Sequence, residues 1–378
     1  MSVIPFGRAV ELVTERSSDD RWKLGLESIE SGTGRLNDVE GDYSGEGVAF
    51  EVGDLLFGKL RPYLAKSWLA TQPGAAVGDF HVYRARQATA DPRFLKYLLL
   101  SSSFLDPIVS SVYGAKMPRA SWDFVRSVAI HVPSMELQAA IADYLDRETA
   151  QIDMLIAKQE QLIDLLRLRR TSFRSTIVEG QNTRMMKLKN LFEPSSQTSA
   201  GGEEVLSVFR EFGIVPKSSK EGNNNRTPED VSRYLIVQPG DLVVNKMKAW
   251  QGSLGISKYS GIVSGDYEVA RPISSLLDAD YAHAVLRSAR RISEYALGST
   301  GIRPSQWRLY WPALSNVEIP VPPLEKQLKI VARLDAETAK IDALIAKAEQ
   351  FIALSKERRA ALITAAVTGQ LEIPGVAA

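Results

Sequence analysis

Basic and aromatic residues alternate at two places in this sequence, where their side chains could donate to phosphates and base edges. Lys59, Arg61 and Tyr63 lie in the first segment, FGKLRPYLAK. Lys248 and Trp250 lie in the second, NKMKAWQGSLGIS. Ammonium and guanidinium groups bind phosphate oxygens, and planar donors can pair with base edges in a groove. Such residues are also common at solvated strand ends and turns, so that structural explanation stays open for each position.

Residues able to carry out a reaction do not form any familiar constellation. The sequence has no cysteine, and surface or packed imidazoles explain its scattered histidines, His81, His131 and His283. It has no glycine-rich loop for a dinucleotide or S-adenosylmethionine and no Gly-x-x-x-x-Gly-Lys-Ser/Thr loop for phosphates. Asn/Asp-Pro-Pro-Tyr/Phe and Glu-x-Lys motifs are also absent. We therefore expect a binding protein with no cofactor or metal of its own.

An enzyme with an unfamiliar site is a second interpretation. Asp54 and Asp241, or Asp79 and Asp266, would then supply the carboxylates. Each of these aspartates follows a glycine and precedes a strand-like run, so a turn explains them more simply.

Composition limits the class of protein. The chain has 378 residues, of which 44% are hydrophobic, so we expect a globular protein of two or three domains. No stretch is apolar enough for a membrane helix and the N-terminus does not resemble a secretory signal, which favours a cytoplasmic location. The net charge of +1 does not indicate nucleic-acid binding. Any such contact must come from local basic clusters or from a partner's surface.

The elements that position these residues are duplicated. Residues 132–181 align without a gap to residues 321–370 at an offset of 189, with 25 identities in 50 positions. The central stretches read ETAQIDMLIAKQEQ and ETAKIDALIAKAEQ. Similarity of this degree indicates a tandem duplication.

Each copy of this repeat predicts one long helix. Apolar residues recur at spacings of three, four and seven, so a single apolar stripe runs along each helix. Prolines precede both starts, and Gly180 and Gly369 mark the ends. The predicted coiled-coil stripe consists of Ile141, Leu145, Ile152, Leu155, Ile156, Leu162, Ile163, Leu166, Ile330, Leu334, Ile341, Leu344, Ile345, Phe351 and Ile352.

A helix of about 43 residues, roughly 65 Å long, needs a partner for such a stripe. We predict an antiparallel coiled coil between the two copies of one chain, which would relate the preceding modules by a pseudo-twofold axis. Packing of each helix on its own module, or dimerisation of the chain through the helices, is the alternative.

The segments ahead of the helices are also related, at an offset of 187. The runs VGDLLFGKLR and PGDLVVNKMK each place a Gly-Asp turn before a strand, and Asp79 similarly matches Asp266. We predict helices over 94–105 and 281–297, and a last strand around residues 128–130 and 317–319. The expected fold class is α+β, with two mixed α/β domains in a pseudo-twofold arrangement separated by two long antiparallel coiled-coil helices.

These motifs together resemble type I restriction-modification specificity subunits. Two copies of Pro-x-x-Glu-x-Gln, starting at Pro133 and Pro322, each lead into IDxLIAKxEQ behind a variable domain. FGKLRPYLAK in the first domain, and NKMKAWQGSLGIS with GIVSGDY in the second, are similar to target-recognition domains of that family. The resemblance covers nearly the whole chain. It implies target-recognition domains over 1–133 and 182–320, and helical spacers over 134–181 and 321–378, the last including the C-terminal tail.

The resemblance also implies a function and partners. Each domain would read one half of a split, asymmetric target in double-stranded DNA, without catalysis, and the paired helices would fix the spacer. Two methyltransferase subunits, which hold S-adenosylmethionine and methylate adenine at N6, would dock on the helices, and two motor-nuclease subunits would complete the enzyme. A modification-only system is a narrower variant. A coiled-coil scaffold that joins proteins without meeting DNA is the alternative.

On this basis the candidate DNA-binding residues can be named. Arginines and lysines late in the helices, such as Arg170 and Arg359, could form a phosphate-binding stripe, but we favour a solvated or partner-facing helix end. The candidates are Lys59, Arg61, Tyr63, Lys66, Arg119, Asn223, Asn224, Asn225, Arg226, Lys246, Lys248, Trp250, Gln251, Arg303 and Gln306.

Overall fold

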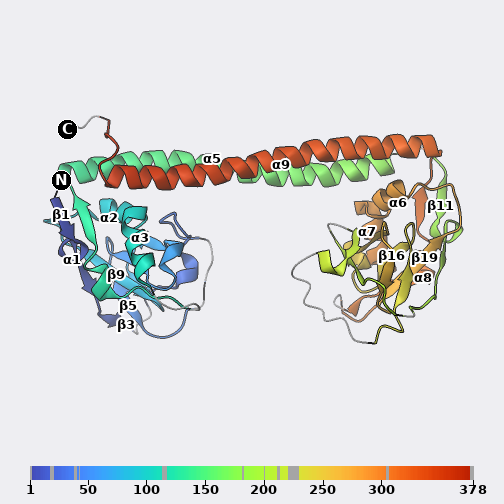
Figure 1. Ribbon diagram of the computed structural model, residues 1–378, viewed down its shortest axis with the longest axis horizontal. Coiled ribbons are helices and arrows are strands. Elements are labelled where there is room, and N and C mark those ends of the chain that lie inside the picture. Colours follow the sequence, from blue (N-terminus) through green and yellow to red (C-terminus); the bar gives the residue numbers. More distant parts are fainter. Residues whose placement is uncertain are drawn as a thin grey trace. The chain divides into compact units, whose positions relative to one another are not determined.

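The chain folds into two compact units, each with one globular module and a segment of both long helices (Figure 1). The first unit comprises Met1–Glu160 and Ala348–Ala378, and the second comprises Gln161–Lys347. The computed structural model describes residues 2–17, 21–37, 41, 43–112, 117–180, 183–199, 201–210, 213–219, 230–303 and 306–374.

The module of the first unit is built on a four-stranded antiparallel sheet in the order β2-β9-β6-β7. A second sheet has the order β3-β5-β8-β4, and β1 pairs with β10. The strands are β1 (Ser2–Pro5), β2 (Val10–Val13), β3 (Arg16–Ser17), β4 (Lys23–Leu24), β5 (Gly47–Phe50), β6 (Leu55–Gly58), β7 (Ser67–Leu69), β8 (Gly74–Ala76), β9 (Phe80–Ala85) and β10 (Ala129–Val132). The helices are α1 (Phe6–Ala9), η1 (Leu26–Ser28), η2 (Pro62–Leu64), α2 (Pro92–Leu98), α3 (Ser102–Ser111) and α4 (Trp122–Val125).

The module of the second unit repeats the main sheet in the order β12-β19-β16-β17, and β11 pairs with β20 as β1 does with β10. In place of the second sheet it has two strand pairs, β13-β14 and β15-β18. The strands are β11 (Met185–Lys187), β12 (Phe192–Pro194), β13 (Leu206–Phe209), β14 (Gly213–Pro216), β15 (Leu235–Val237), β16 (Leu242–Asn245), β17 (Leu254–Ile256), β18 (Gly261–Val263), β19 (Tyr267–Pro272) and β20 (Glu318–Pro320). The helices are η3 (Leu188–Asn190), η4 (Lys217–Ser219), η5 (Ala249–Gln251), α6 (Ala279–Leu286), α7 (Ala289–Gly298) and α8 (Trp311–Leu314).

The helical stretch predicted in each module is divided in two. Ser101 is the N-cap of α3 and Ser288 is the N-cap of α7, so each serine begins a new helix where the sequence predicted a continuous one. The Ser288 side chain accepts from the Arg291 amide, and serine in this position favours a helix start over a helix interior.

The two predicted long helices are α5 (Met135–Glu179) and α9 (Leu324–Val367). In the first unit Leu145 shares a buried cluster with Ile363, and the Asp153 and Arg359 side chains are 3.0 Å apart. In the second unit Ile177 shares a cluster with Ile330, while Arg170 lies 2.7 Å from Asp342 on α9. Residue numbers rise along one helix as they fall along the other, so the predicted antiparallel pairing is confirmed within each unit.

The structure corrects the predicted stripe at four positions. Leu155, Leu162, Leu344 and Phe351 are 46%, 41%, 49% and 40% exposed. Since a single partner helix covers a narrower band than the width of this apolar face, these side chains lie outside the buried seam. The other predicted members are buried, except for the half-buried Ile345 and Ile352: they are Ile141, Leu145, Ile152, Ile156, Ile163, Leu166, Ile330, Leu334 and Ile341.

A buried glutamine joins each long helix to its own module. The Gln138 amide donates to the carbonyls of Thr89 (3.1 Å) and Pro133 (2.9 Å) and accepts from the Asp91 amide (2.8 Å). Gln327 makes the equivalent three bonds in the second unit, at 2.7, 2.7 and 2.8 Å. The glutamine of the Pro-x-x-Glu-x-Gln motif therefore fixes the helix start against the loop before α2 or α6.

Candidate nucleic-acid interface

A lysine, an aspartate and an arginine meet on the surface of the first module. The Arg119 guanidinium donates to both carboxylate oxygens of Asp79 at 3.1 and 3.0 Å, and the Lys59 ammonium lies 3.8 Å from the same carboxylate. The Arg119 side chain is 53% exposed and that of Lys59 is 30% exposed. Two cations around one carboxylate leave a net positive, solvent-accessible group.

The same three residue types meet in the second module. Arg308 lies 3.1 Å from the Asp266 carboxylate, and the Lys246 ammonium donates to the Gly265 carbonyl at 2.6 Å. The backbone amide of Lys246 also donates to the Asp266 carbonyl at 3.0 Å, as that of Lys59 does to Asp79 at 2.9 Å. We call these two groups the lysine–aspartate–arginine clusters.

Arg308 was missed by the sequence analysis, which selected Arg303 and Gln306 instead. The backbone shows the correspondence, because Ala120 donates to the Lys59 carbonyl and Leu309 donates to the Lys246 carbonyl. These residues match at the offset of 189, whereas the preceding lysines and aspartates match at 187. Extending the match between Trp122 and Trp311 backwards would have identified Arg308.

A tight turn follows each cluster lysine and presents further predicted residues. In the first module Arg61 and Ala65 flank η2 with φ of 51° and 47°, in the left-handed region. Gly252, with φ of 88°, takes the place of Ala65 after η5. Left-handed backbone at non-glycine residues is strained and is often retained at functional sites. Within this turn Tyr63 is 56% exposed.

The remaining predicted residues differ in their accessibility. Lys66 donates to the Leu26 carbonyl at 2.6 Å and is therefore engaged within its own module. Gln251 accepts from Arg210 at 2.6 Å, and Trp250 packs edge-on against Trp307 at 5.6 Å. Arg61, Lys248, Arg303 and Gln306 are exposed, whereas Asn223, Asn224, Asn225 and Arg226 lie outside the described residues.

A neutral histidine lies beside the first cluster. Burial, together with the positive charge of Lys59, lowers the pKa of His81 to about 4. Its Nδ1 lies 3.0 Å from the Tyr83 hydroxyl. At neutral pH this imidazole adds no charge to the cluster.

The aspartates proposed for an unfamiliar enzyme site have structural partners. Asp54 is 2% exposed, accepts from the Arg84 guanidinium at 2.8 and 2.6 Å, and accepts from the Glu51 amide. Asp241 accepts from the Gln238 amide at 2.8 Å. These bonds hold the turns ahead of β6 and β16, as the simpler explanation predicted. Among the described residues no group of three His, Asp or Glu side chains could hold a metal ion, and no helix could cross a membrane.

The chain was compared with known proteins in sequence and in structure. No family model matches the chain. It is 20% identical over 342 residues to the type I restriction enzyme EcoDI specificity subunit of Escherichia coli, across 78% of this chain and 74% of that protein. It matches a chain from work on complex assembly and conformational transition of the type I R-M system with a TM-score of 0.72, 18% identity and 98% coverage of both chains.

The chain resembles type I restriction specificity subunits in sequence and shares their fold. A second solved structure, the HsdS subunit from Thermoanaerobacter tengcongensis, matches with a TM-score of 0.56 and 18% identity over 98% of this chain and 97% of that one. These findings confirm the predicted resemblance and the α+β class of two mixed domains with long helices. Within this fold the two lysine–aspartate–arginine clusters lie at equivalent places on the two modules.

Proposed function

We propose that this chain recognises a two-part target in double-stranded DNA, with each module contacting one half. The observation that carries this proposal is the duplicated lysine–aspartate–arginine cluster, placed each time beside a tight turn with an exposed or half-exposed aromatic residue. Exposed cations beside planar side chains supply both kinds of contact that DNA recognition needs, to phosphates and to base edges. A protein-joining scaffold has no evident need for the same cationic group on both modules.

Within each module we propose a division of labour. Features that the two modules share cannot distinguish two different half-sites, so the clusters would bind phosphates and set the position of the module. Sequence would be read by the residues that differ, such as Tyr63 in one module and Trp250 at the matching position of the other. Phosphate contacts fix register, while base-edge contacts discriminate between sequences.

The long helices would dock the subunits that carry out methylation. Leu155, Leu162 and Leu165 on α5 are exposed, and so are their repeat equivalents Leu344, Phe351 and Leu354 on α9. These equivalent apolar faces lie outside the buried seam, and exposed apolar surface of this kind marks an interaction site. We propose that each face receives one methyltransferase subunit holding S-adenosylmethionine, and that motor-nuclease subunits join the full assembly. The chain itself would bind no cofactor and perform no catalysis.

The paired helices would then set the distance between the half-sites. The ion pair of Asp153 with Arg359, and its repeat equivalent of Asp342 with Arg170, fix the register of α5 on α9 in each unit. A fixed register gives a constant unread spacer, and a pseudo-twofold relation between the modules would orient them on one duplex.

Genome-wide mapping of N6-methyladenine tests this function. The chain is co-expressed with the methyltransferase subunit encoded beside it in a host that lacks adenine methylation. We expect methylation at one two-part motif with a constant spacer, and exchange of one module should change one half of that motif. An active methyltransferase complex that adds no methylation would refute the proposal and favour the scaffold. Co-expression with the nuclease subunit, read out by phage restriction, separates a full restriction enzyme from a modification-only system.

A further inference from the structure

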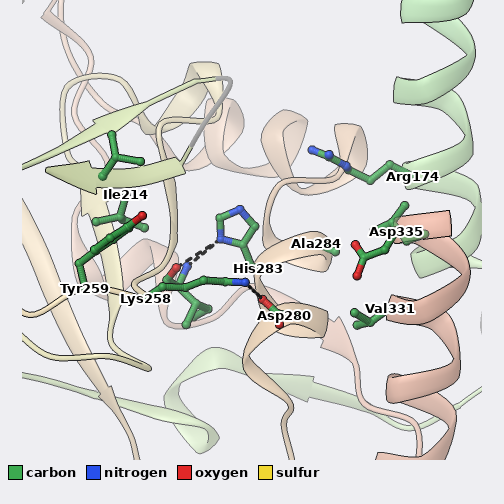
Figure 2. Close-up of a pocket in the computed structure, with 12 residues that line it drawn as sticks. Arg174, Ile214, Lys258, Tyr259, Asp280, His283, Ala284, Val331 and Asp335 are labelled. Atoms are coloured by element: carbon green, nitrogen blue, oxygen red, sulfur yellow. Dashed lines mark hydrogen bonds and ion pairs between the residues drawn. The ribbon is translucent and has the colours of Figure 1, made fainter. Parts of the chain in front are cut away.

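A cavity of about 310 Å³ opens in the second unit where the module meets α5 and α9 (Figure 2). Its apolar lining includes Ile214 from β14, Ile256 from β17 and Leu334 from α9. Figure 2 shows Arg174 and Asp335 extending from the two long helices toward the space beside His283. The cavity thus combines an apolar wall with a cation and an anion.

Within the described part of the chain, other charges act on these two groups only at longer range, Asp342 on Arg174 and Lys258 on Asp335. Arg174 and Asp335 make no hydrogen bond or ion pair there, whereas the neighbouring Lys258 and Asp280 pair with each other at 2.6 Å. Burial lowers the pKa of Arg174, and repulsion from Arg170 adds to that effect. Arg174 is half-buried and Asp335 is exposed, so both side chains are accessible to a ligand group of opposite charge.

The first unit shows what the equivalent space contains when it is filled. Asp146 is the repeat equivalent of Asp335, and it accepts from the Tyr97 hydroxyl at 2.5 Å and from Lys96 at 3.3 Å. In the second unit the matching positions hold Ala284 and His283. At these positions the second unit therefore has neither the phenol ring nor the ammonium group that bond the carboxylate in the first unit, and His283 bonds to Ile256 instead.

A second difference between the units lies on α5. Arg174 is the repeat equivalent of Ile363, which is buried in the core of the first unit with 1% exposure. An apolar side chain closes that wall in the first unit, while a guanidinium lines the cavity in the second. Both differences favour a ligand in the second unit. Ala284 in place of Tyr97 leaves space, and Arg174 in place of Ile363 adds a group that binds carboxylates.

We propose that this cavity binds a small zwitterion with an aromatic body, of the size of a phenylalanine or tyrosine molecule. The ammonium of the ligand would meet Asp335, its carboxylate would meet Arg174, and its ring would lie against the apolar wall. The ligand would replace the ring and the donors that Tyr97 and Lys96 supply in the first unit. Pockets of this volume are in the range that binds small molecules.

Calorimetric titration of the full chain with L-phenylalanine and L-tyrosine tests this inference. Phenethylamine, which lacks the carboxylate, and 3-phenylpropionate, which lacks the ammonium, serve as matched probes. We expect saturable binding of the amino acids at millimolar concentration, and at least tenfold weaker binding of both matched probes. Arg174→Ile should remove the preference for L-phenylalanine over phenethylamine, and Asp335→Asn should remove its preference over 3-phenylpropionate.

Filling the cavity provides a second test. Ala284→Tyr reproduces the first unit and should abolish binding, and a retained cooperative thermal transition shows that this variant is folded. Tyr97→Ala in the first unit should create no second site, because Ile363 stands there in place of Arg174. The proposal is overturned by absence of saturable binding, or by binding that the Arg174 and Asp335 variants leave unchanged. Since these titrations contain no DNA, their outcome is independent of the methylation experiment.

Discussion

Removal of the two cluster arginines tests whether the duplicated clusters bind phosphates. The variant carries Arg119→Ala and Arg308→Ala. Each phosphate contact contributes about 0.9 to the slope of log affinity against log salt, so the pair should lower that slope by roughly 1.8. At low salt we expect about a tenfold loss of affinity per arginine, corresponding to roughly 1.4 kcal/mol each. The loss should be equal on target and non-target duplexes, because phosphates carry no sequence information.

Fluorescence anisotropy of the assembled methyltransferase complex on labelled duplexes measures this slope over a fourfold range of salt. Arg126→Ala is the matched control, since this similarly exposed arginine pairs with Asp123 and not with a cluster aspartate. Asp79→Asn should tighten binding, because it removes the carboxylate that holds Arg119 and Lys59. Folding should be retained, as exposed ion pairs contribute at most about 1 kcal/mol. An unchanged salt slope, or a changed ratio of target to non-target affinity, would show that the clusters do not bind phosphates.

Three further predictions concern stability. Gln138→Leu should destabilise the first unit by about 3 kcal/mol in urea, because one buried and two half-buried backbone groups lose partners at roughly 1–3 kcal/mol each. A loss below about 1 kcal/mol would show that the glutamine does not fix the helix start. Arg359→Ala should cost about 3–5 kcal/mol in thermal unfolding, since its ion pair is buried. The exposed Arg170→Ala should cost about 1 kcal/mol or less, and equal losses would contradict this reasoning. The pKa values of His81 and His283 are lowered from 6.5 to about 4, mainly by burial. Between pH 6.5 and 4 the unfolded chain therefore binds more protons than the folded chain, and the free energy of unfolding should fall as the pH drops. The expected loss is at most roughly 3 kcal/mol per histidine. Replacement of both histidines by glutamine should flatten that part of the urea stability profile, and an unaltered profile would refute their burial as the cause.

The regular elements followed from local patterns in the sequence. The spacing of apolar residues and the flanking prolines and glycines predicted α5 and α9 closely, because helix periodicity and end signals are local properties. The Gly-Asp turns predicted β6 and β16 for the same reason. The division of the module helices was missed, since Ser101 and Ser288 favour a helix start that apolar periodicity alone does not reveal.

The extent of each buried surface did not follow from local patterns. Leu155 and Leu344 fit the apolar period, yet they are exposed because burial depends on how much of the face the partner helix covers. Arg308 was missed for a related reason. Its link to Asp266 spans 42 residues of chain, and a shift in the repeat offset hides its correspondence with Arg119.

The sequence by itself determined the duplication, the two long helices, the α+β class and the resemblance to specificity subunits, because each is written in residue spacing or in similarity between the two copies. Only the tertiary structure brought Lys59, Asp79 and Arg119 together, gave Gln138 its three partners, and opened beside Asp335 the space that Tyr97 fills beside Asp146. The physical reason is that hydrogen bonds, ion pairs and cavities depend on distances between segments remote in sequence. Periodicity and end signals describe one segment at a time, and the folded chain alone sets those distances.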